Sequence, residues 1–362
     1  MNERDKYRGC LIGGAAGDAL GYAVEFIGEK EIFRCFGERG ITRYALTRGE
    51  AYISDDTQMT LFTAAGLLAH KARNSKDLPT ALVNESYKDW LITQNGRYPL
   101  KPGRYVSWLM GEGDLFCPRA PGNTCLAALR QGGGGTPDDP INNSKGCGGV
   151  MRAAPAGLFF CGEAGKSADA ALLGARVTAL THGHPLGWLP GAALAQIVYE
   201  VVRGERVAAA AAHALDTIDA LWPDAGSRVF FRALMEKAAA LAEEGGSDLD
   251  AIHALGEGWT GDEAMAIALY CAIRYEDDID RALIAAVNHK GDSDSTGAVA
   301  GNIVGARVGL DRIPEKYLEK LELRQVILTV ADDLWRAAFP GEDGEGDAWT
   351  ARYQGMIVEK KA

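Results

Sequence analysis

Residues 291–310, GDSDSTGAVAGNIVGARVGL, place a short cluster of acids and hydroxyls directly before a run of small and apolar residues. The run has the composition of a helix that is covered on all sides, because Arg307 is its one charged residue. Asp292 and Asp294 stand at its head, where the positive end of the helix dipole favours carboxylates. The segment therefore predicts a buried helix with acids at its N-terminus.

Apolar residues recur with helical spacing along most of the chain, and few segments alternate as β-strands do. Glycine and proline residues separate these segments. A further helix of small residues is expected within residues 9–26, where glycine and alanine permit close helix packing. The segments with helical spacing are 57–72, 78–92, 122–131, 167–180, 186–203, 206–221, 226–244, 262–273, 278–288, 296–309 and 324–338.

The predicted fold class is therefore all-α. We expect one compact multi-helix domain over residues 1–340, followed by an acidic, glycine-rich segment and C-terminal extension at residues 341–362. The stretch 21–53 is ambiguous and predicts either a short hairpin or a loop that closes over a site. No internal repeat of roughly 20–50 residues is present, which argues against a solenoid.

Composition excludes several classes of protein. The 362 residues carry a formal net charge of −11, which argues against nonspecific binding to nucleic acid or to an anionic membrane surface. The seven cysteines show no Cys-x-x-Cys spacing, so neither a disulfide framework nor a zinc ribbon is expected. Neither a secretory signal nor an apolar run of about 18 residues is apparent. These features predict a cytoplasmic protein.

Residues 54–57, SDDT, form a second cluster of acids and hydroxyls ahead of an apolar run. Neither cluster contains a lysine or arginine that would neutralise its carboxylates. Oxygen ligands of this kind suit Mg²⁺, Mn²⁺ or Ca²⁺ rather than Zn²⁺ or Cu²⁺. If the fold brings the clusters together, they predict a two-metal centre with the ions roughly 3.5–4 Å apart.

Each cluster alone also has a purely structural explanation. Ser54 is a good helix N-cap, and acids in a first helical turn complement the dipole. An EF-hand loop beginning at Asp292 is excluded, because Ile303 stands where that loop needs a glutamate. The occurrence of two such clusters, each before a buried helix, favours the metal site.

Residues 142–158, NNSKGCGGVMRAAPAGL, offer a glycine-rich turn before an apolar run. Backbone N–H groups of such a turn can bind a diphosphate, although an ordinary glycine-rich connector is the alternative. In residues 181–185, THGHP, His182 and His184 have the spacing of a metal pair. A hydrogen-bonding role is favoured, because the acidic clusters already supply a hard-ion site and no thiol or third histidine is close in sequence.

Two acids interrupt the small-residue helix near the N-terminus. Asp18 and Glu25 lie within an otherwise apolar segment, and buried acids require a cation or hydrogen-bond donors. They are therefore candidates for the shell around the metals.

Taken together and in this order, six motifs resemble the ADP-ribosylglycohydrolase family, in particular its dinitrogenase reductase-activating and ADP-ribosylarginine hydrolase branch. The resemblance extends from about residue 6 to about residue 340. The motifs are GDALG with a following glutamate, SDDTQMT, RAPGNT, SKGCGGVMRAAP, THGHP and GDSDSTGAVAGNIVGA.

The resemblance implies two Mg²⁺ or Mn²⁺ ions at the base of a cleft for ADP-ribose. It implies Asp55 or Glu25 as the general base, with Glu25 on a mobile flap. By position, it implies one ion on Ser54, Asp55 and Asp56 and the other on Asp292 and Ser295, with Asp294 bridging. Substrate contacts are implied for Ser144, for the diphosphate loop of Gly146, Cys147, Gly148 and Gly149, and for His182.

The activity implied is removal of ADP-ribose from a modified protein, by hydrolysis of the N-glycosidic bond to arginine. Ser295 and the SDDTQMT form favour arginine over serine or O-acetyl linkages, and Glu112, Asp114 and Asp262 are expected near the cleft, where they would attract a cationic acceptor. An alternative is an immunity-type protein that binds and occludes a cognate ADP-ribosyltransferase toxin.

Overall fold

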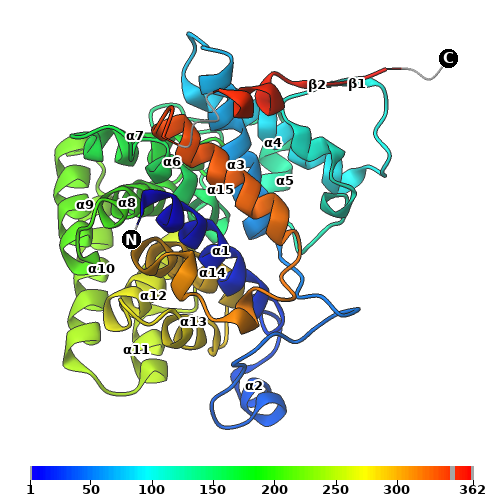
Figure 1. Ribbon diagram of the computed structural model, residues 1–362. Coiled ribbons are helices and arrows are strands. Elements are labelled where there is room, and N and C mark those ends of the chain that lie inside the picture. The colour runs from blue at the N-terminus through cyan, green and yellow to red at the C-terminus, as the bar shows by residue number, and fades with distance from the viewer. Residues whose placement is uncertain (1, 343–346, 360–362) are drawn as a thin grey trace.

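The computed structural model describes residues 2–342 and 347–359 of the chain, and it is almost entirely helical (Figure 1). Within the described residues, the only sheet is one pair of short strands, which confirms the predicted all-α class. No helix among them is both long and apolar enough to cross a membrane. The elements are α1 Glu3–Tyr22, α2 Glu29–Phe36, α3 Asp55–Ala72, α4 Pro79–Asn95, β1 Gly103–Tyr105, α5 Asn123–Arg130, α6 Ala154–Leu158, α7 Ser167–Ala179, α8 Pro185–Val202, α9 Val207–Leu221, α10 Ser227–Glu244, α11 Asp248–Leu255, α12 Gly261–Arg274, α13 Ile279–Val287, α14 Ser293–Val308, α15 Arg324–Ala338 and β2 Met356–Val358.

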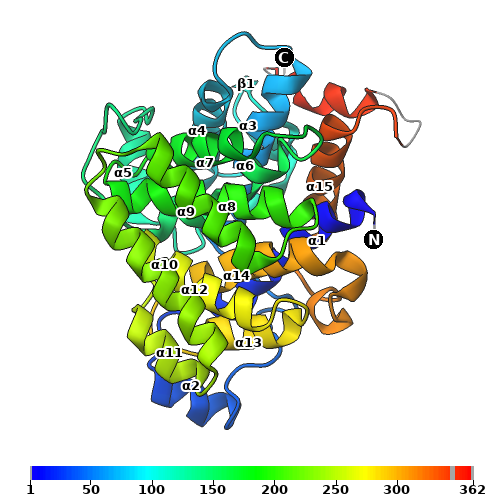
Figure 2. The same ribbon diagram turned by 90° about the vertical axis from the view of Figure 1, so that its left-hand side faces the viewer.

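The centre of the domain is a closely packed pair of helices, α1 and α14, that are far apart in the sequence (Figures 1 and 2). Glycines of one helix face the backbone of the other, and a Cβ atom built on any of them would lie within 3.0 Å of it. The residue numbers of the facing pairs rise along α1 and fall along α14, so the two helices run antiparallel. These pairs are Gly9 with Gly305, Gly13 with Gly301, Gly17 with Gly297, and Gly21 with Ser293.

Other helices cover this central pair. Helices α8, α12 and α13 contact α14, while α15 contacts α1 and α3. The side chains of α8 are buried almost without exception, because α7, α9 and α12 also pack against it. In Figure 2, α9 and α10 lie on the outer side of α8 and α12. The small residues predicted to form a helix within residues 9–26 thus lie in α1, where they pack against a matching row of small residues in α14.

The stretch 21–53 contains a helix that its sequence did not predict. Helix α2 is amphipathic and buries only Ile32, and it projects from the body of the domain at the foot of Figure 1. A single bridge joins Thr47 to Glu50, and Ala51 pairs in parallel with Leu321. The predicted hairpin is therefore limited to one tight turn, because the backbone N–H groups of Ile41, Ala51 and Ile53 donate to distant segments instead.

Residues 347–359 pack onto the helical domain. Strand β2 pairs antiparallel with β1, with Arg104 opposite Ile357. Trp349 and Tyr353 are buried, and the Tyr353 hydroxyl donates a hydrogen bond to Asp333 at 3.0 Å. Residues 343–346, the acidic part of the expected extension, lie outside the described residues.

Candidate active site

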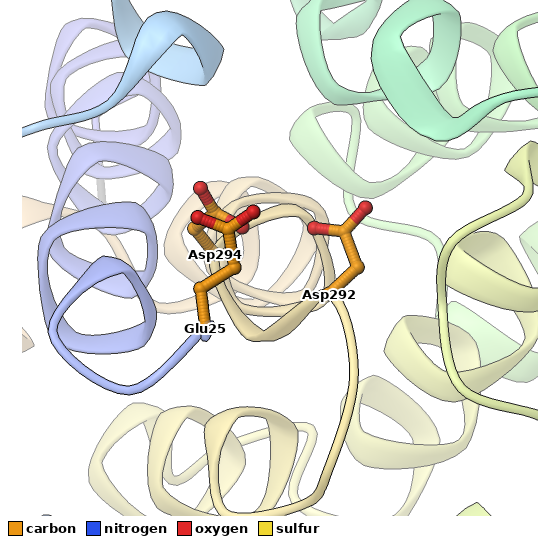
Figure 3. A group of neighbouring side chains, drawn as sticks. All are labelled: Glu25, Asp292 and Asp294. Atoms are coloured by element: carbon orange, nitrogen blue, oxygen red, sulfur yellow. The ribbon is translucent and has the colours of Figure 1, made fainter. Parts of the chain in front are cut away.

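The two acidic clusters meet in one cavity of about 480 Å³. Ser54 caps α3 and Asp292 caps α14, so the N-termini of both helices point toward the same place. The carboxylates are almost completely buried, with exposed fractions of 8% or less. Figure 3 shows three of them, Glu25, Asp292 and Asp294, gathered at the head of α14. The acids that line the cavity are Glu25, Asp55, Asp56, Asp292 and Asp294.

The packing of α1 against α14 brings these acids together. Gly21 lies against the backbone of Ser293, so the end of α1 meets the start of α14, and Glu25 follows two residues after the helix C-cap at Ala23. Asp18 is wholly buried one turn earlier and accepts hydrogen bonds from the backbone N–H groups of Ser54 at 2.9 Å and Thr57 at 3.0 Å. Asp18 therefore holds the first turn of α3 in place, as expected of a residue in the outer shell.

The cluster is electrostatically unfavourable as five free anions. Burial raises the pKa of Asp55, Asp56 and Asp294 well above the ordinary carboxyl value, and the neighbouring carboxylates raise it further. For Glu25, burial and then Asp294 raise the pKa to about 10. None of the described residues that line the cavity is a lysine or arginine. A cation is therefore needed if these groups are to be charged together near neutral pH.

The donor set fits hard divalent ions. One oxygen each from Glu25, Asp292 and Asp294 can be chosen so that all three lie within 4.8 Å of one another. Two further carboxylate oxygens, Glu25 Oε2 and Asp56 Oδ2, are buried with no hydrogen-bond partner among the described residues. Carboxylate and hydroxyl oxygens without imidazole nitrogen are typical of Mg²⁺ and Mn²⁺ sites.

The two serines expected as ligands occupy different positions. Ser295 lines the cavity, and its backbone N–H donates to Asp292 and Asp294 at 3.2 and 3.0 Å. Ser54 does not line the cavity and is wholly buried, with its hydroxyl accepting from the N–H of Asp56 at 3.2 Å. Ser54 thus caps the helix, as its sequence context also suggested, and its hydroxyl also hydrogen bonds to Asp294.

The glycine-rich turn forms a second wall of the same cavity. Gly146, Cys147 and Gly148 line it, at the start of a 3₁₀ helix over Cys147–Arg152. The segment before α12 supports the turn, because the N–H of Cys147 donates to the carbonyl of Trp259 at 3.3 Å. A Cβ atom on Gly146 or Gly148 would fill the space between the turn and the imidazole of His182. Both positions therefore keep room for a ligand.

Two other residues expected in this loop lie behind the wall. Gly149 packs against Thr178 and the carbonyl of Gly187, where it permits close approach of α8. Ser144 hydrogen bonds to Thr124 at 3.0 Å and lies next to the cavity without lining it. Sequence context does not separate such neighbours from lining residues, because all of them belong to one continuous loop.

The whole-chain comparison decides the family. The sequence matches the model of the family described as ADP-ribosylglycohydrolase over residues 1–343. This chain is an ADP-ribosylglycohydrolase family member. The resemblance drawn from the six motifs is confirmed, and it holds over nearly the whole chain.

Individual relatives agree with this assignment. ADP-ribosyl-[dinitrogen reductase] glycohydrolase of Rhodospirillum rubrum is 27% identical over 325 residues, which cover 88% of this chain and 91% of that protein. ADP-ribosylhydrolase ARH3 of Homo sapiens is 26% identical over 357 residues, covering 88% and 89%. A solved structure described as an ADP-ribosylglycohydrolase-related protein complex shares the fold, with a TM-score of 0.61 at 23% identity over 93% of this chain and 99% of that one.

The histidines of this ADP-ribosylglycohydrolase have separate roles. His182 lines the cavity, and burial followed by the charge of Arg152 lowers its pKa to about 3, so that it is neutral. His184 instead caps α8, since its Nδ1 accepts from the N–H of Leu186 at 3.0 Å. The two histidines are thus not a metal pair, in agreement with the expected hydrogen-bonding role.

An aromatic pair at the cavity was not expected from the sequence. Phe26 and Trp259 are 70% and 42% exposed and stack with ring centroids 6.5 Å apart. Both line the cavity, together with residues 120–124 of the RAPGNT segment and Cys125. No local signal distinguishes these two rings from core aromatics, although Phe26 directly follows the candidate acid Glu25.

The acids expected at the rim for a cationic acceptor are placed elsewhere. Glu112, Asp114 and Asp262 do not line the cavity. Asp262 is buried in the first turn of α12, where it complements the helix dipole. These three acids therefore give no support for a cationic acceptor such as arginine.

Divalent ions are expected to stabilise the folded protein. If the cluster binds ions, it can do so only when the two helix N-termini are assembled, so Mg²⁺ or Mn²⁺ at 100 times its Kd should add about 2.7 kcal/mol to the free energy of unfolding. Thermal unfolding with and without the ion, in a chelator-treated sample, measures the gain. Asp292→Asn should lose most of it, whereas Asp114→Asn, outside the cavity, should keep it. An equal gain in both variants would place the ions elsewhere.

Proposed function

We propose that this chain is a metal-dependent hydrolase that removes ADP-ribose from modified protein by cleaving the N-glycosidic bond to arginine. The observation that carries the proposal is the meeting of five buried acids, a glycine-rich turn and a neutral histidine in one cavity. Family membership supports the glycohydrolase activity. The Ser295 and SDDTQMT forms and the Rhodospirillum rubrum relative support the arginine linkage over the one cleaved by a serine-directed branch.

Two Mg²⁺ or Mn²⁺ ions are proposed at the acidic end of the cavity. Ser54, Asp55 and Asp56 would hold one ion and Asp292 and Ser295 the other, with Asp294 between them. Bound ions of this kind orient ribose hydroxyls and lower the pKa of water. The Ser54 hydroxyl also accepts a hydrogen bond from the N–H of Asp56, which positions that acid.

The chain's own residues orient the substrate and move the proton. The turn of Gly146, Cys147 and Gly148 would take the diphosphate, and His182 would donate a hydrogen bond to the same half of the ligand. Glu25 and Asp55 are the two candidates for the general base. Asp55 Oδ2 accepts from the N–H of Gly122 at 3.1 Å, which fixes its orientation. Glu25 Oε2, in contrast, has no hydrogen-bond partner within the described part of the chain and is open to a proton.

The bond to be broken sets one further requirement. Cleavage at the anomeric carbon develops positive charge on the ribose, which the surrounding carboxylates stabilise. Guanidine is a poor leaving group, so its nitrogen must be protonated or hydrogen bonded as the bond breaks.

The cysteines favour a cytoplasmic location. All seven are free thiols, which suits a reducing compartment, and we propose the cytoplasm on that ground.

Parallel hydrolysis assays test the linkage. With Mg²⁺ present, we expect release of ADP-ribose from an ADP-ribosyl-arginine peptide at least about tenfold faster than from an ADP-ribosyl-serine peptide, a difference of about 1.4 kcal/mol in transition-state free energy. A chelator-treated sample is the control for both reactions. Release from the serine peptide alone would overturn the arginine linkage but not the hydrolase. If neither peptide is cleaved, occlusion of an ADP-ribosylating toxin becomes the function to test.

A further inference from the structure

Arg152 is a buried cation without a carboxylate partner. It is the last residue of the 3₁₀ helix that starts at the glycine-rich turn, and its exposed fraction is 0%. Its guanidinium lies over the ring of Tyr87 at 4.3 Å and contacts the sulfur atoms of Met59 and Cys125 at 3.1 and 3.5 Å. No carboxylate of residues 2–342 or 347–359 forms an ion pair with it. Burying a guanidinium charge without a carboxylate is energetically costly, so a functional role for Arg152 is sought in its remaining hydrogen bond.

Among the described residues, Arg152 donates to one oxygen atom, which belongs to Thr181. Arg152 Nη2 donates to Thr181 Oγ1 at 2.5 Å, and Thr181 Oγ1 lies 2.8 Å from His182 Nδ1. A guanidinium has donors only, so the threonine hydroxyl accepts from Arg152. Its own hydrogen is then available for His182 Nδ1. Cys125 also lies beside this hydroxyl, but a thiol sulfur is the weaker acceptor.

A neutral imidazole that accepts at Nδ1 carries its proton on Nε2. This second nitrogen faces the glycine-rich turn, since a Cβ atom on Gly146 would lie 3.4 Å from it. Among the described residues, Nε2 has no hydrogen-bond partner, and His182 lines the cavity. The donor is therefore directed at the space where a ligand oxygen would lie.

We propose that Arg152, acting through Thr181, fixes the proton of His182 on Nε2 and so makes this nitrogen a permanent hydrogen-bond donor to an oxygen of bound ADP-ribose. The chain of contacts assigns Arg152 and Thr181 as positioning residues. The identity of the ligand rests on the proposed function, whereas the tautomer of His182 does not. A fixed donor suits a phosphate or hydroxyl oxygen, because it needs no rearrangement when the ligand enters.

The tautomer is measured directly in the unaltered protein. In ¹⁵N-histidine-labelled protein, long-range ¹H–¹⁵N spectra distinguish a protonated Nε2 from a protonated Nδ1, and His182→Gln identifies the resonance. We expect the Nε2–H form throughout pH 5.5–8. A proton on Nδ1 would overturn the proposal whether or not the protein hydrolyses any substrate. The tautomer itself is read from the unaltered protein, and His182→Gln serves only to assign the resonance.

The consequence for binding is tested at Thr181. Thr181→Val keeps the shape and removes the hydroxyl, so we expect a mixed tautomer and about tenfold weaker binding of free ADP-ribose by calorimetry. With a substrate that is cleaved, KM should rise by a similar factor while kcat changes less than about twofold, as for an interaction made equally in both states. Thr181→Ser, which restores the hydroxyl, should rescue both the tautomer and the affinity. Unchanged affinity in Thr181→Val would overturn the proposal.

Discussion

Asp294→Asn is expected to abolish ADP-ribose release, with a loss in kcat of at least about a thousandfold, or roughly 4 kcal/mol. Asp294 is the acid at which both proposed ions meet, and it lies with Glu25 and Asp292 in the one group of carboxylates close enough to share an ion among the described residues. Its replacement removes charge from both ion sites at once. Hydrolysis of the ADP-ribosyl-arginine peptide at saturating Mg²⁺ measures the loss.

When a chelator is present, the same substitution should increase the free energy of unfolding, although it abolishes activity. Burial and Asp292 raise the pKa of Asp294 well above its unfolded value, so the folded state loses stability as the pH rises above the ordinary carboxyl pKa. Asn removes that loss, and the variant should be more stable than the parent at pH 8 and similar to it near pH 4. Increased stability together with lost activity separates a missing ligand from a misfolded protein.

Ser54→Ala is the matched variant for this experiment. Its hydroxyl hydrogen bonds to the N–H of Asp56 and to Asp294 but carries no charge, so we expect a reduction in kcat of about tenfold rather than a complete loss. Equal and mild reductions in Asp294→Asn and Ser54→Ala would contradict the assignment of Asp294 as the bridging ligand. Full activity of the parent protein in excess chelator would contradict the metal centre itself.

Gly17→Ala is expected to reduce the free energy of unfolding by at least about 3 kcal/mol. A Cβ atom at this position would overlap the carbonyl oxygen and carbon of Gly297, well inside 3.0 Å. Two helix backbones cannot yield as a flexible side chain can, so α1 and α14 must separate. Because their contact also carries Glu25 toward Asp294, ion-dependent stabilisation should fall in the same variant. Urea unfolding, with and without Mg²⁺, measures both effects.

Gly226→Ala is the control for the helix contact. Gly226 has an ordinary φ of −53°, and a Cβ atom there would meet no heavy atom within 4 Å. The substitution should leave the protein unchanged or stabilise it by less than about 1 kcal/mol. If Gly17→Ala unfolds at the same urea concentration as Gly226→Ala, the close contact of α1 with α14 is wrong.

The sequence by itself determined the class of fold and the chemistry of the site. Helical spacing, N-caps and glycine or proline breaks depend on residues a few positions apart. Helices can therefore be predicted from each segment by itself. The acids of SDDT and GDSDST could be recognised as a donor set suited to hard ions for the same reason, since the donor types are a property of the residues. The order of six motifs then identified the family without any coordinates.

Only the tertiary structure decided which residues face the cavity. The partner of α1 is α14, some 280 residues away, and that contact brings Glu25 to Asp294. It also placed Phe26 and Trp259 together at the cavity. Neighbours in a loop have the same local signals whether they line a cavity or support it. Their roles depend on contacts between distant segments, which helical periodicity and capping do not encode.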